Sequence, residues 1–327
     1  MSFLPSPDRD VFSARPVPNA LTVDVEDYYH VSAFEGQVDR TRWSEYPGRV
    51  KENTEQLLAI FRRRQVRATF FILGWVAQHD PDLVRQIQAE GHELGAHSFW
   101  HQRIYTQLPD AFREDLVRSR DLLTQLTGQP VRCYRAASFS ITPACWWALE
   151  ILVQEGFQYD CSVFPIWHDR YGVPEAPVGI YRVETPSGSI WEFPPAVYQI
   201  AGLKVPCGGG GYFRLYPLGL TLWLLRAIRR QGRPFLFYLH PWELDPQQPR
   251  LPGSLLSRFR HYWNLSATAR RLEELLDQFL FAPVSEVVEE YLRQKEGHIE
   301  VLRLGDLGKL AEKGLKTVIQ PLGGVQS

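Results

Sequence analysis

Residues 20–27 read ALTVDVED, an apolar run that ends in three closely spaced carboxylates. Such a run is typical of a buried β-strand. Beyond it, short β-rich runs recur along the chain, and we predict strands in RATFFIL (67–73), HELGAH (92–97), VRCYRA (131–136), FQYDCS (157–162) and PFLFYLH (234–240). The segments between them carry helical patterns. This alternation predicts an α/β protein whose βα units form a parallel sheet or barrel.

Proline and glycine indicate where the predicted helices begin and end. Proline favours the first position of a helix and glycine the position after its last turn, as at Pro81 and Gly91 or Pro109 and Gly128. We predict helices over residues 53–64, 81–91, 109–126, 143–156, 218–231, 268–281 and 285–294.

The regular pattern weakens at residues 165–215, which are rich in proline, glycine and aromatic residues. This composition predicts an irregular β-rich insertion that shapes a groove. The run GGGGYFR (208–214) lacks the Lys-Ser/Thr of a phosphate-binding loop, so we interpret it as a flexible groove wall. We expect an N-terminal extension over 1–19, one domain over 20–297, and a tail over 298–327 whose apolar residues fall at helical intervals.

The composition narrows the class of function. Among 327 residues, 36 Lys and Arg nearly balance 37 Asp and Glu, which predicts no nucleic-acid partner. The four cysteines form no CxxC pair, and the N-terminus lacks the basic start and apolar run of a signal peptide. The longest apolar stretch, 218–228, contains Arg226 and is too short for a membrane span. We therefore expect a cytoplasmic protein.

Ionisable residues stand at the ends of the predicted strands, where a parallel α/β domain gathers its chemistry. They are Asp24, Glu26, Asp27, His97, His101, Arg135, Asp160 and His240.

The histidines of HSFWH (97–101) are candidate metal ligands. Their four-residue spacing would put both imidazoles on one side of a helical turn, although such pairs also arise by chance. Carboxylates after a strand often cap the next helix instead. Two histidines and one carboxylate would leave an open position for water, as in catalytic zinc sites.

His240 follows an apolar strand and precedes Pro241 and Trp242. Buried histidines are usually structural, but a carboxylate partner would make this one a general acid, and Asp160 is the partner we predict. Arg135 would orient the base and keep it ionised, with a plain ion pair as the alternative.

Five motifs together resemble the NodB-type polysaccharide deacetylases of carbohydrate esterase group 4. They are TVDVED (22–27), HSFWH (97–101), YRAASFS (134–140), YDCS (159–162) and YLHPWE (238–243), and the resemblance covers about residues 20–290. The sequence looks closest to the deacetylases of exosortase-associated exopolysaccharide loci.

The resemblance implies a distorted barrel of about seven strands, a (β/α)7-type fold. It also implies a divalent metal, most often zinc, and removal of acetyl groups from an N-acetylated oligo- or polysaccharide, here in exopolysaccharide biosynthesis with assembly partners.

The resemblance also implies roles for individual residues. Asp24 would be the general base, His97 and His101 metal ligands, Arg135 the residue that orients the base, His240 the general acid and Asp160 its partner. The first motif departs from the family because Val25 replaces the usual second aspartate. The third ligand is then Glu26 or Asp27. Strand alternation puts Glu26 on the same face as Asp24, which favours Glu26.

Two other functions remain open. The altered first motif also suits a metal-independent amide hydrolase resembling allantoinase-like members of the superfamily. A glycan-binding scaffold without catalysis is the third hypothesis. Aromatic residues of the insertion are candidates to stack on sugar rings at the rim of the site, with a place in the core as the alternative for several of them; they are Trp167, Tyr171, Trp191, Tyr198 and Tyr212.

Overall fold

The computed structural model describes residues 16–295, 298–307 and 318–321. Seven strands form a parallel barrel in the order β10-β1-β2-β3-β4-β5-β7. Their bounds are β1 Asn19–Val25, β2 Thr69–Ile72, β3 Glu93–Ala96, β4 Cys133–Tyr134, β5 Tyr159–Asp160, β7 Gly188–Glu192 and β10 Leu236–Leu239.

The barrel closes through irregular backbone rather than a full strand pair. The segment after β7 meets β10 by a single parallel bridge between Pro195 and Leu236, where the Ala196 N–H donates to the Leu236 carbonyl over 2.9 Å. The barrel is therefore distorted where β7 and β10 fail to pair fully. The predicted (β/α)7-type barrel is confirmed.

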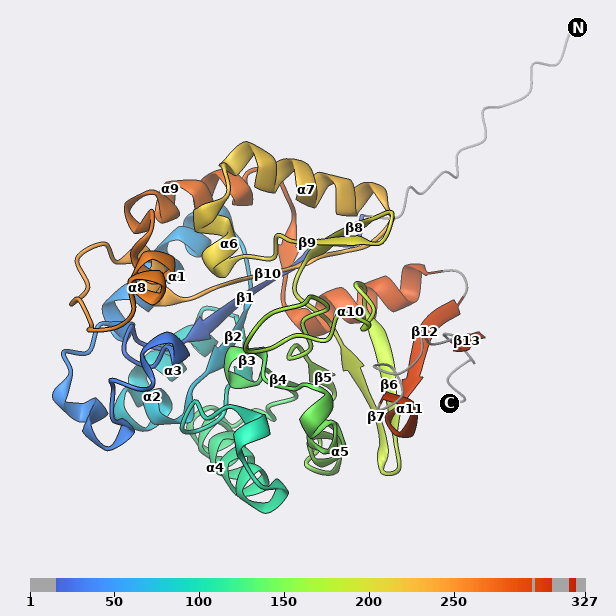
Figure 1. Cartoon of the computed structure of the whole chain (residues 1–327), viewed down its shortest axis with the longest axis horizontal. Helices are drawn as coiled ribbons and strands as arrows, with labels where there is room; N and C mark the ends of the chain where they lie inside the picture. The colour runs from blue at the N-terminus through green and yellow to red at the C-terminus, as the bar shows by residue number, and fades with distance from the viewer. Residues whose placement is uncertain (1–15, 296–297, 308–317, 322–327) are drawn as a thin grey trace, which may run out of the picture.

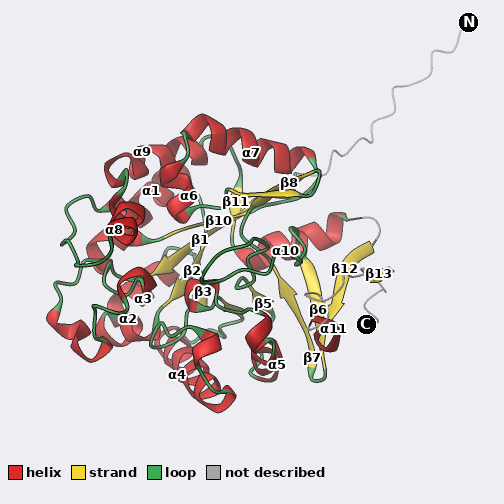
Figure 2. Ribbon diagram, viewed as in Figure 1, coloured by secondary structure: helices red, strands yellow, loops and turns green. Residues whose placement is uncertain are grey.

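Helices cover the outside of the barrel, with α7 and α9 on one side and α4 and α5 on the opposite side (Figure 1). Figure 2 shows how they alternate with the strands. Most begin or end as predicted: Pro109 opens α4, and Gly128 follows it with φ 68°. The bounds are α1 Val50–Arg64, α2 Gly74–His79, α3 Pro81–Ala89, α4 Pro109–Thr127, α5 Trp147–Gln154, α7 Leu218–Arg230 and α9 Leu265–Leu276.

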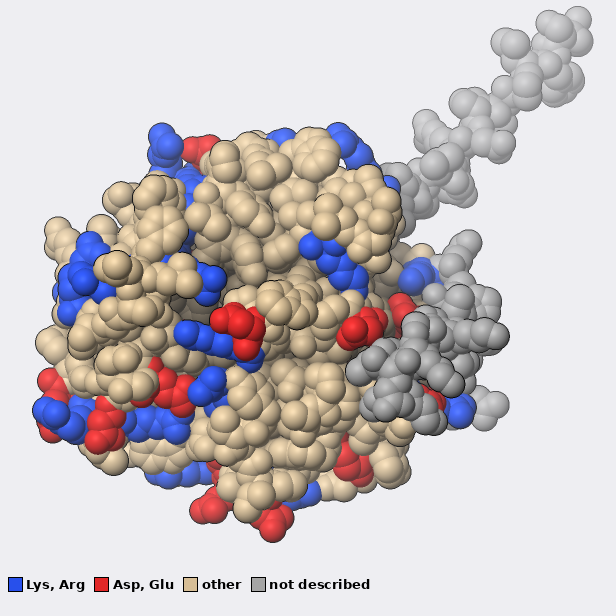
Figure 3. Space-filling model, viewed as in Figure 1, with Lys and Arg blue, Asp and Glu red and all other residues tan. Residues whose placement is uncertain are grey.

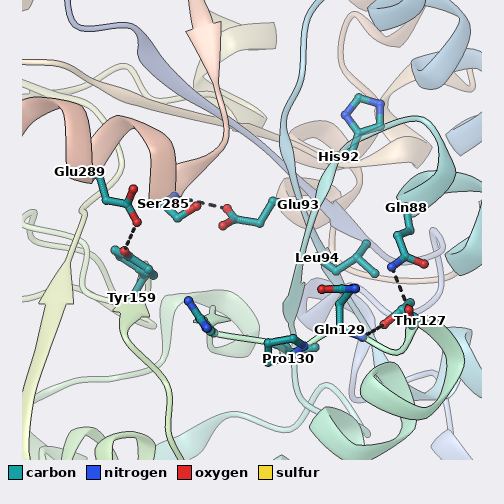
Figure 4. A pocket seen from close by; sticks show the side chains of 12 residues that line it. Gln88, His92, Glu93, Leu94, Thr127, Gln129, Pro130, Tyr159, Ser285 and Glu289 are labelled. Carbon is teal, nitrogen blue, oxygen red and sulfur yellow. Dashed lines mark hydrogen bonds between the residues drawn. The ribbon is translucent and has the colours of Figure 1, made fainter.

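Helix α10 (Val284–Gln294) closes the end of the barrel where the strands begin. Strand β11 (Phe281–Ala282) first pairs with the start of β1. Val284, Val287 and Val288 then pack into an apolar cluster that includes the inward-facing Phe71. A polar pocket at this closed end is crossed by the hydrogen bond from the Tyr159 hydroxyl to Glu289 over 3.1 Å (Figure 4). The opposite, carboxyl end of the strands is left for the site.

The insertion contains two antiparallel hairpins, β6 (Tyr181–Thr185) with β7 and β8 (Val197–Ile200) with β9 (Leu203–Pro206). The glycine run lines a groove at Gly211, as predicted, but it is not a flexible loop. Gly209 lies against β10, where a Cβ would come within 1.8 Å of the Tyr238 carbonyl oxygen, and α6 (Gly210–Leu215) begins at the next residue. Gly208 and Gly209 are there because two backbones approach closely. A further helix, α8 (Leu255–Tyr262), was not predicted.

Of the tail predicted to be helical, only Leu304–Leu307 form a helix within the described residues. Residues His298–Arg303 form β12, parallel to β6, followed by the short α11 (Leu304–Leu307) and by β13 (Val318–Pro321), which is antiparallel to β12. Ile299 and Val301 alternate into buried positions, the period of a strand. Residues 308–317, 322–327 and most of the predicted N-terminal extension (1–15) lie outside the described residues.

Two surface properties bear on the predicted partners. Lysine and arginine are interspersed with aspartate and glutamate over the face seen in Figure 3. Within the described ranges, no helix is both long and apolar enough to cross a bilayer.

Candidate active site

A cavity of about 210 Å³ opens at the carboxyl ends of the strands. Five residues predicted from the sequence line it: Asp24, Glu26, His97, His101 and His240. They lie at or directly after the carboxyl ends of β1, β3 and β10. Strand β1 pairs with β10 on one side and with β2, the neighbour of β3, on the other. Parallel pairing therefore gathers side chains that lie more than 200 residues apart in the chain.

Glu26, His97 and His101 form the group suited to a metal ion. One ligand atom of each lies within 4.8 Å of the others, and all three side chains are buried. Glu26 Oε2 is 2.8 Å from His101 Nε2, yet it has no hydrogen-bond partner of good geometry. Two electron-pair donors that face each other without sharing a hydrogen bond, in a buried site, fit a divalent cation held by two imidazoles and one carboxylate.

The two imidazoles are held by their loop. His97 Nδ1 donates to the Arg135 carbonyl over 2.8 Å, which leaves its Nε2 lone pair for the cavity. The helical turn predicted for HSFWH is wrong, because Ser98 and His101 have φ of 63° and 51°. Asp115 of α4 fixes this loop by accepting hydrogen bonds from two of its N–H groups, at 2.7 and 3.1 Å.

Glu26 is anchored from the opposite side. The Trp242 indole N–H donates to Glu26 Oε1 over 3.2 Å. Burial alone would raise the pKa of Glu26, but His101, His240 and His97 together bring it below its usual range. Glu26 is therefore an anion among imidazoles.

Asp27, the alternative third ligand, does not join the two imidazoles but contacts the start of α1. Its carboxylate accepts from the Arg49 N–H at 2.6 Å and the Val50 N–H at 2.9 Å, at the start of α1. Burial raises its pKa to about 6. The structure thus brings Glu26 to the imidazoles and leaves Asp27 capping a helix.

Asp24 forms an ion pair with Arg135. Arg135 Nη1 donates to Asp24 Oδ1 at 2.5 Å and to Thr22 Oγ1 at 2.9 Å, and its guanidinium lies 4.3 Å from the centre of the Phe71 ring. Arg135 is fully buried. The second oxygen of Asp24 remains on the cavity, 3.7 Å from His240 Nε2.

His240 has a carboxylate partner, but it is not the one predicted. Its Nδ1 donates to Glu243 Oε1 over 2.7 Å, and Glu243 in turn accepts from Arg214 Nε at 2.6 Å. Burial would lower the pKa of His240, but the bond to Glu243 and the carboxylates Glu26 and Asp24 raise it to about 9. His240 is therefore protonated at neutral pH, with Nε2 facing the cavity.

The predicted partnership of Asp160 with His240 is wrong. Asp160 Oδ1 accepts from the Ser162 hydroxyl, and burial raises the pKa of Asp160 and, well above its usual value, that of Glu192 on the paired strand. Ser162 also accepts from the Ala136 N–H at 2.8 Å. Asp160 thus supports the backbone beside Arg135 from below the cavity.

Glu243 and Arg214 were missed in the sequence. Glu243 stands three residues after His240 in HPWE, the spacing of a single 3-10 turn over Pro241–Leu244. Arg214 ends GGGGYFR. Of the five aromatic candidates, Tyr171 lines the cavity and Tyr212 an adjoining groove, while Tyr198 of β8 packs against Trp223.

The barrel and its site place the chain in a structural class. A putative polysaccharide deacetylase from Mycobacterium smegmatis superimposes with a TM-score of 0.60 at 18% identity, covering 90% of this chain and 96% of that one. A probable polysaccharide deacetylase from Pseudomonas aeruginosa PAO1 gives 0.54 at 17% identity, covering 84% and 90%. The class defined by this fold is the NodB-type barrel.

Sequence comparison adds a family similarity over part of the chain. Residues 42–154 match the polysaccharide deacetylase family, and residues 161–289 match a domain of unknown function, DUF3473. A peptidoglycan-N-acetylglucosamine deacetylase of Bacillus cereus is 32% identical over 24% of this chain and 28% of its own length. A chitooligosaccharide deacetylase of Rhizobium leguminosarum bv. trifolii is 31% identical over 25% and 40%. This chain thus covers less than half the length of these curated relatives.

Proposed function

We propose that this protein is a metal-dependent hydrolase that removes acetyl groups from the amino sugars of a glycan. Water adds to the acetyl carbon, the amide C–N bond breaks, and the products are acetate and a free amine. The observation that carries this proposal is the buried Glu26–His97–His101 group beside Asp24, which is paired with Arg135, and a protonated His240. Relatives named as deacetylases of peptidoglycan and chitooligosaccharides support the glycan substrate.

Glu26, His97 and His101 would hold the cation, for which we propose zinc. When bound there, such an ion supplies Lewis acidity for the acetyl carbonyl and for water. The remaining chemistry belongs to the side chains around it.

Asp24 is placed to take a proton, because one of its oxygens faces the cavity while Arg135 holds the other. The ion pair with Arg135 fixes the orientation of this carboxylate. His240 Nε2 is placed to give a proton to the leaving nitrogen, and Glu243 holds the ring in that orientation.

The test couples metal analysis to acetate release. Purified protein should contain about one zinc ion per chain and release acetate from N-acetylated chitooligosaccharides or peptidoglycan fragments, and chelation should abolish the release. Glu26→Gln should lose both zinc and activity. Asp27→Asn is the matched control and should keep zinc, because the Asp27 carboxylate accepts hydrogen bonds from the backbone at the start of α1.

Other outcomes would assign a different function. Acetate release that survives complete metal removal would indicate the metal-independent amide hydrolase. Binding of an acetylated oligosaccharide without acetate release under any metal would indicate a glycan-binding scaffold. The exopolysaccharide setting, the assembly partners and the cytoplasmic location rest on the sequence alone and belong to this proposal; cell fractionation tests the location.

A separate prediction concerns the proton donor. His240→Ala should lower kcat by roughly 10²- to 10⁴-fold, the usual contribution of a positioned general acid. Zinc content should stay at the wild-type value, since His240 is not in the group of three. Full activity in this variant would remove His240 from the mechanism.

A further inference from the structure

A groove of about 380 Å³ adjoins the catalytic cavity, and four residues line both: His168, Tyr171, Tyr238 and Arg260. This volume lies within the range of small-molecule sites, roughly 300–1,000 Å³. The rest of its lining comes from α6, α8 and the residue after α8, and consists of Gly211, Tyr212, Leu215, Leu256, Phe259 and Trp263. A ligand with one end in the cavity can therefore extend into this groove.

The groove is apolar at the surface of the protein. Leu215, Leu256, Phe259 and Trp263 are 52%, 57%, 47% and 48% exposed. Large contiguous apolar patches on a soluble protein mark binding surfaces. Aromatic rings alone would suit the faces of sugar rings, but two leucines give a glycan no hydrogen bond and no stacking surface. Their chemistry suits a hydrocarbon chain.

Arginine side chains mark the junction between the polar cavity and the apolar groove. Arg260 lines both, and Arg170 lines the cavity. Within the described residues, neither guanidinium forms an ion pair with a carboxylate; the nearby Asp169 contacts His168 Nδ1 at 2.9 Å. Arg103, also at the cavity, is already paired with Glu35. Free guanidinium groups at such a junction are complementary to a phosphate.

We propose that the substrate is an amphiphile, an N-acetyl amino sugar joined through a phosphate to an alkyl or polyprenyl chain. The sugar would occupy the cavity, the phosphate would meet Arg260, and the chain would lie between α6 and α8. This inference rests on the proposed deacetylase function and specifies its substrate class.

The test compares kcat/KM for acetate release from four probes below their critical micelle concentrations. They are dodecyl-phospho-N-acetylglucosamine, methyl-phospho-N-acetylglucosamine, dodecyl N-acetylglucosaminide and tetra-N-acetylchitotetraose. Each methylene moved from water into an apolar site favours binding by roughly fourfold. A chain that only partly fills an open groove should then give the dodecyl phosphate at least a tenfold advantage over the methyl phosphate.

Variants test whether the preference for the dodecyl phosphate arises in the groove. Leu256→Ser combined with Phe259→Ser should reduce the dodecyl-to-methyl ratio to about twofold or less, and Arg260→Gln should abolish the preference for dodecyl phosphate over dodecyl glycoside. Leu203→Ser is the matched control, because Leu203 is an equally exposed leucine on β9 outside the groove. It should keep the wild-type ratios.

Equal kcat/KM for the dodecyl and methyl phosphates would overturn the inference. So would a groove variant that loses activity on chitotetraose instead, since the groove would then bind glycan. Calorimetric titration of dodecyl phosphate into wild type and the double variant measures binding without catalysis. If no probe releases acetate, the proposed function fails, while this titration still decides whether the groove takes an alkyl phosphate.

Discussion

At the scale of single residues, the site depends on which oxygen or nitrogen of each side chain is not already hydrogen-bonded within the protein. Arg135 occupies one oxygen of Asp24, Trp242 one oxygen of Glu26, and Glu243 one nitrogen of His240. In each case the second polar atom faces the cavity. The protein thereby fixes the orientation of each group and the proton position on the imidazole before any substrate arrives.

The sequence predicted the face on which the carboxylates lie, but it did not predict the hydrogen-bond partner of His240. The two-residue period of a strand put Asp24 and Glu26 on one face, and the structure agrees. The partner of His240 could not be inferred in the same way. Asp160 and Glu243 both follow or lie near strand ends, and only the 3-10 turn after β10 decides that Glu243 reaches the ring.

A buried ion pair at this position should affect stability with a defined pH dependence. Burial alone would raise the pKa of Glu243, but Arg214 and His240 lower it to about 2. A depressed carboxylate pKa stabilises the fold above the unfolded-state pKa, and this stabilisation is lost as pH falls toward the folded-state pKa. Glu243→Gln should therefore lower the free energy of unfolding by about 3 kcal/mol at pH 7, and the difference should shrink between about pH 4.5 and 2.

Urea unfolding of wild type and Glu243→Gln at pH 7, 4 and 3 measures this difference. Glu184→Gln, which removes a partly exposed carboxylate paired with Arg182, is the control and should change stability by less than about 1 kcal/mol. A difference for Glu243→Gln that stays constant with pH would contradict the depressed pKa.

At the scale of elements, the order of strands and helices was predictable, whereas contacts between distant segments were not. Helices α3 and α4 begin at prolines and precede glycines, which are local signals. The backbone conformations of the glycine run and of HSFWH depend on contacts with segments that are distant in sequence. Gly209 meets β10, and the loop after β3 is shaped by Asp115 of α4, so neither conformation follows from local propensity.

The close approach of Gly209 to β10 predicts a specific sensitivity. Gly209 has φ 126°, and a Cβ there would clash with the backbone of Tyr238. Gly209→Ala should destabilise the protein by about 3 kcal/mol or more, because it adds both overlap and backbone strain. Since Tyr238 lines the cavity, kcat/KM should fall as well.

Gly219→Ala in α7 is the matched control for this substitution. Gly219 is helical and has open space around its Cα, so alanine should stabilise the fold by roughly 0.5–1 kcal/mol. Thermal unfolding of the two variants compares them directly. Equal stability of Gly209→Ala and wild type would show that α6 can move away from β10.

At the scale of the whole molecule, the two family matches are parts of one barrel. The first match ends with α5 and the second begins directly after β5, so the gap between them holds one strand of the same barrel. The first match supplies His97, His101 and Arg135, and the second supplies His240 with its partners Glu243 and Arg214. Asp24 and Glu26 precede both matches. The site therefore exists only when β1 lies between β10 and β2.

If the proposed metal binds, this assembly from distant segments should couple its binding to folding. An ion that binds the folded site and not the unfolded chain stabilises by about 4 kcal/mol at a thousand times its dissociation constant, which for a domain of this size raises Tm by roughly 5–10 °C. Calorimetric scans of chelator-treated protein with and without zinc measure this shift. His101→Gln should abolish it, whereas His92→Gln, a buried histidine at the closed end of the barrel, should retain it. An undiminished shift in His101→Gln would place the zinc elsewhere, because a site held by Glu26 and His97 alone would not bind strongly enough to join the loops after β1 and β3.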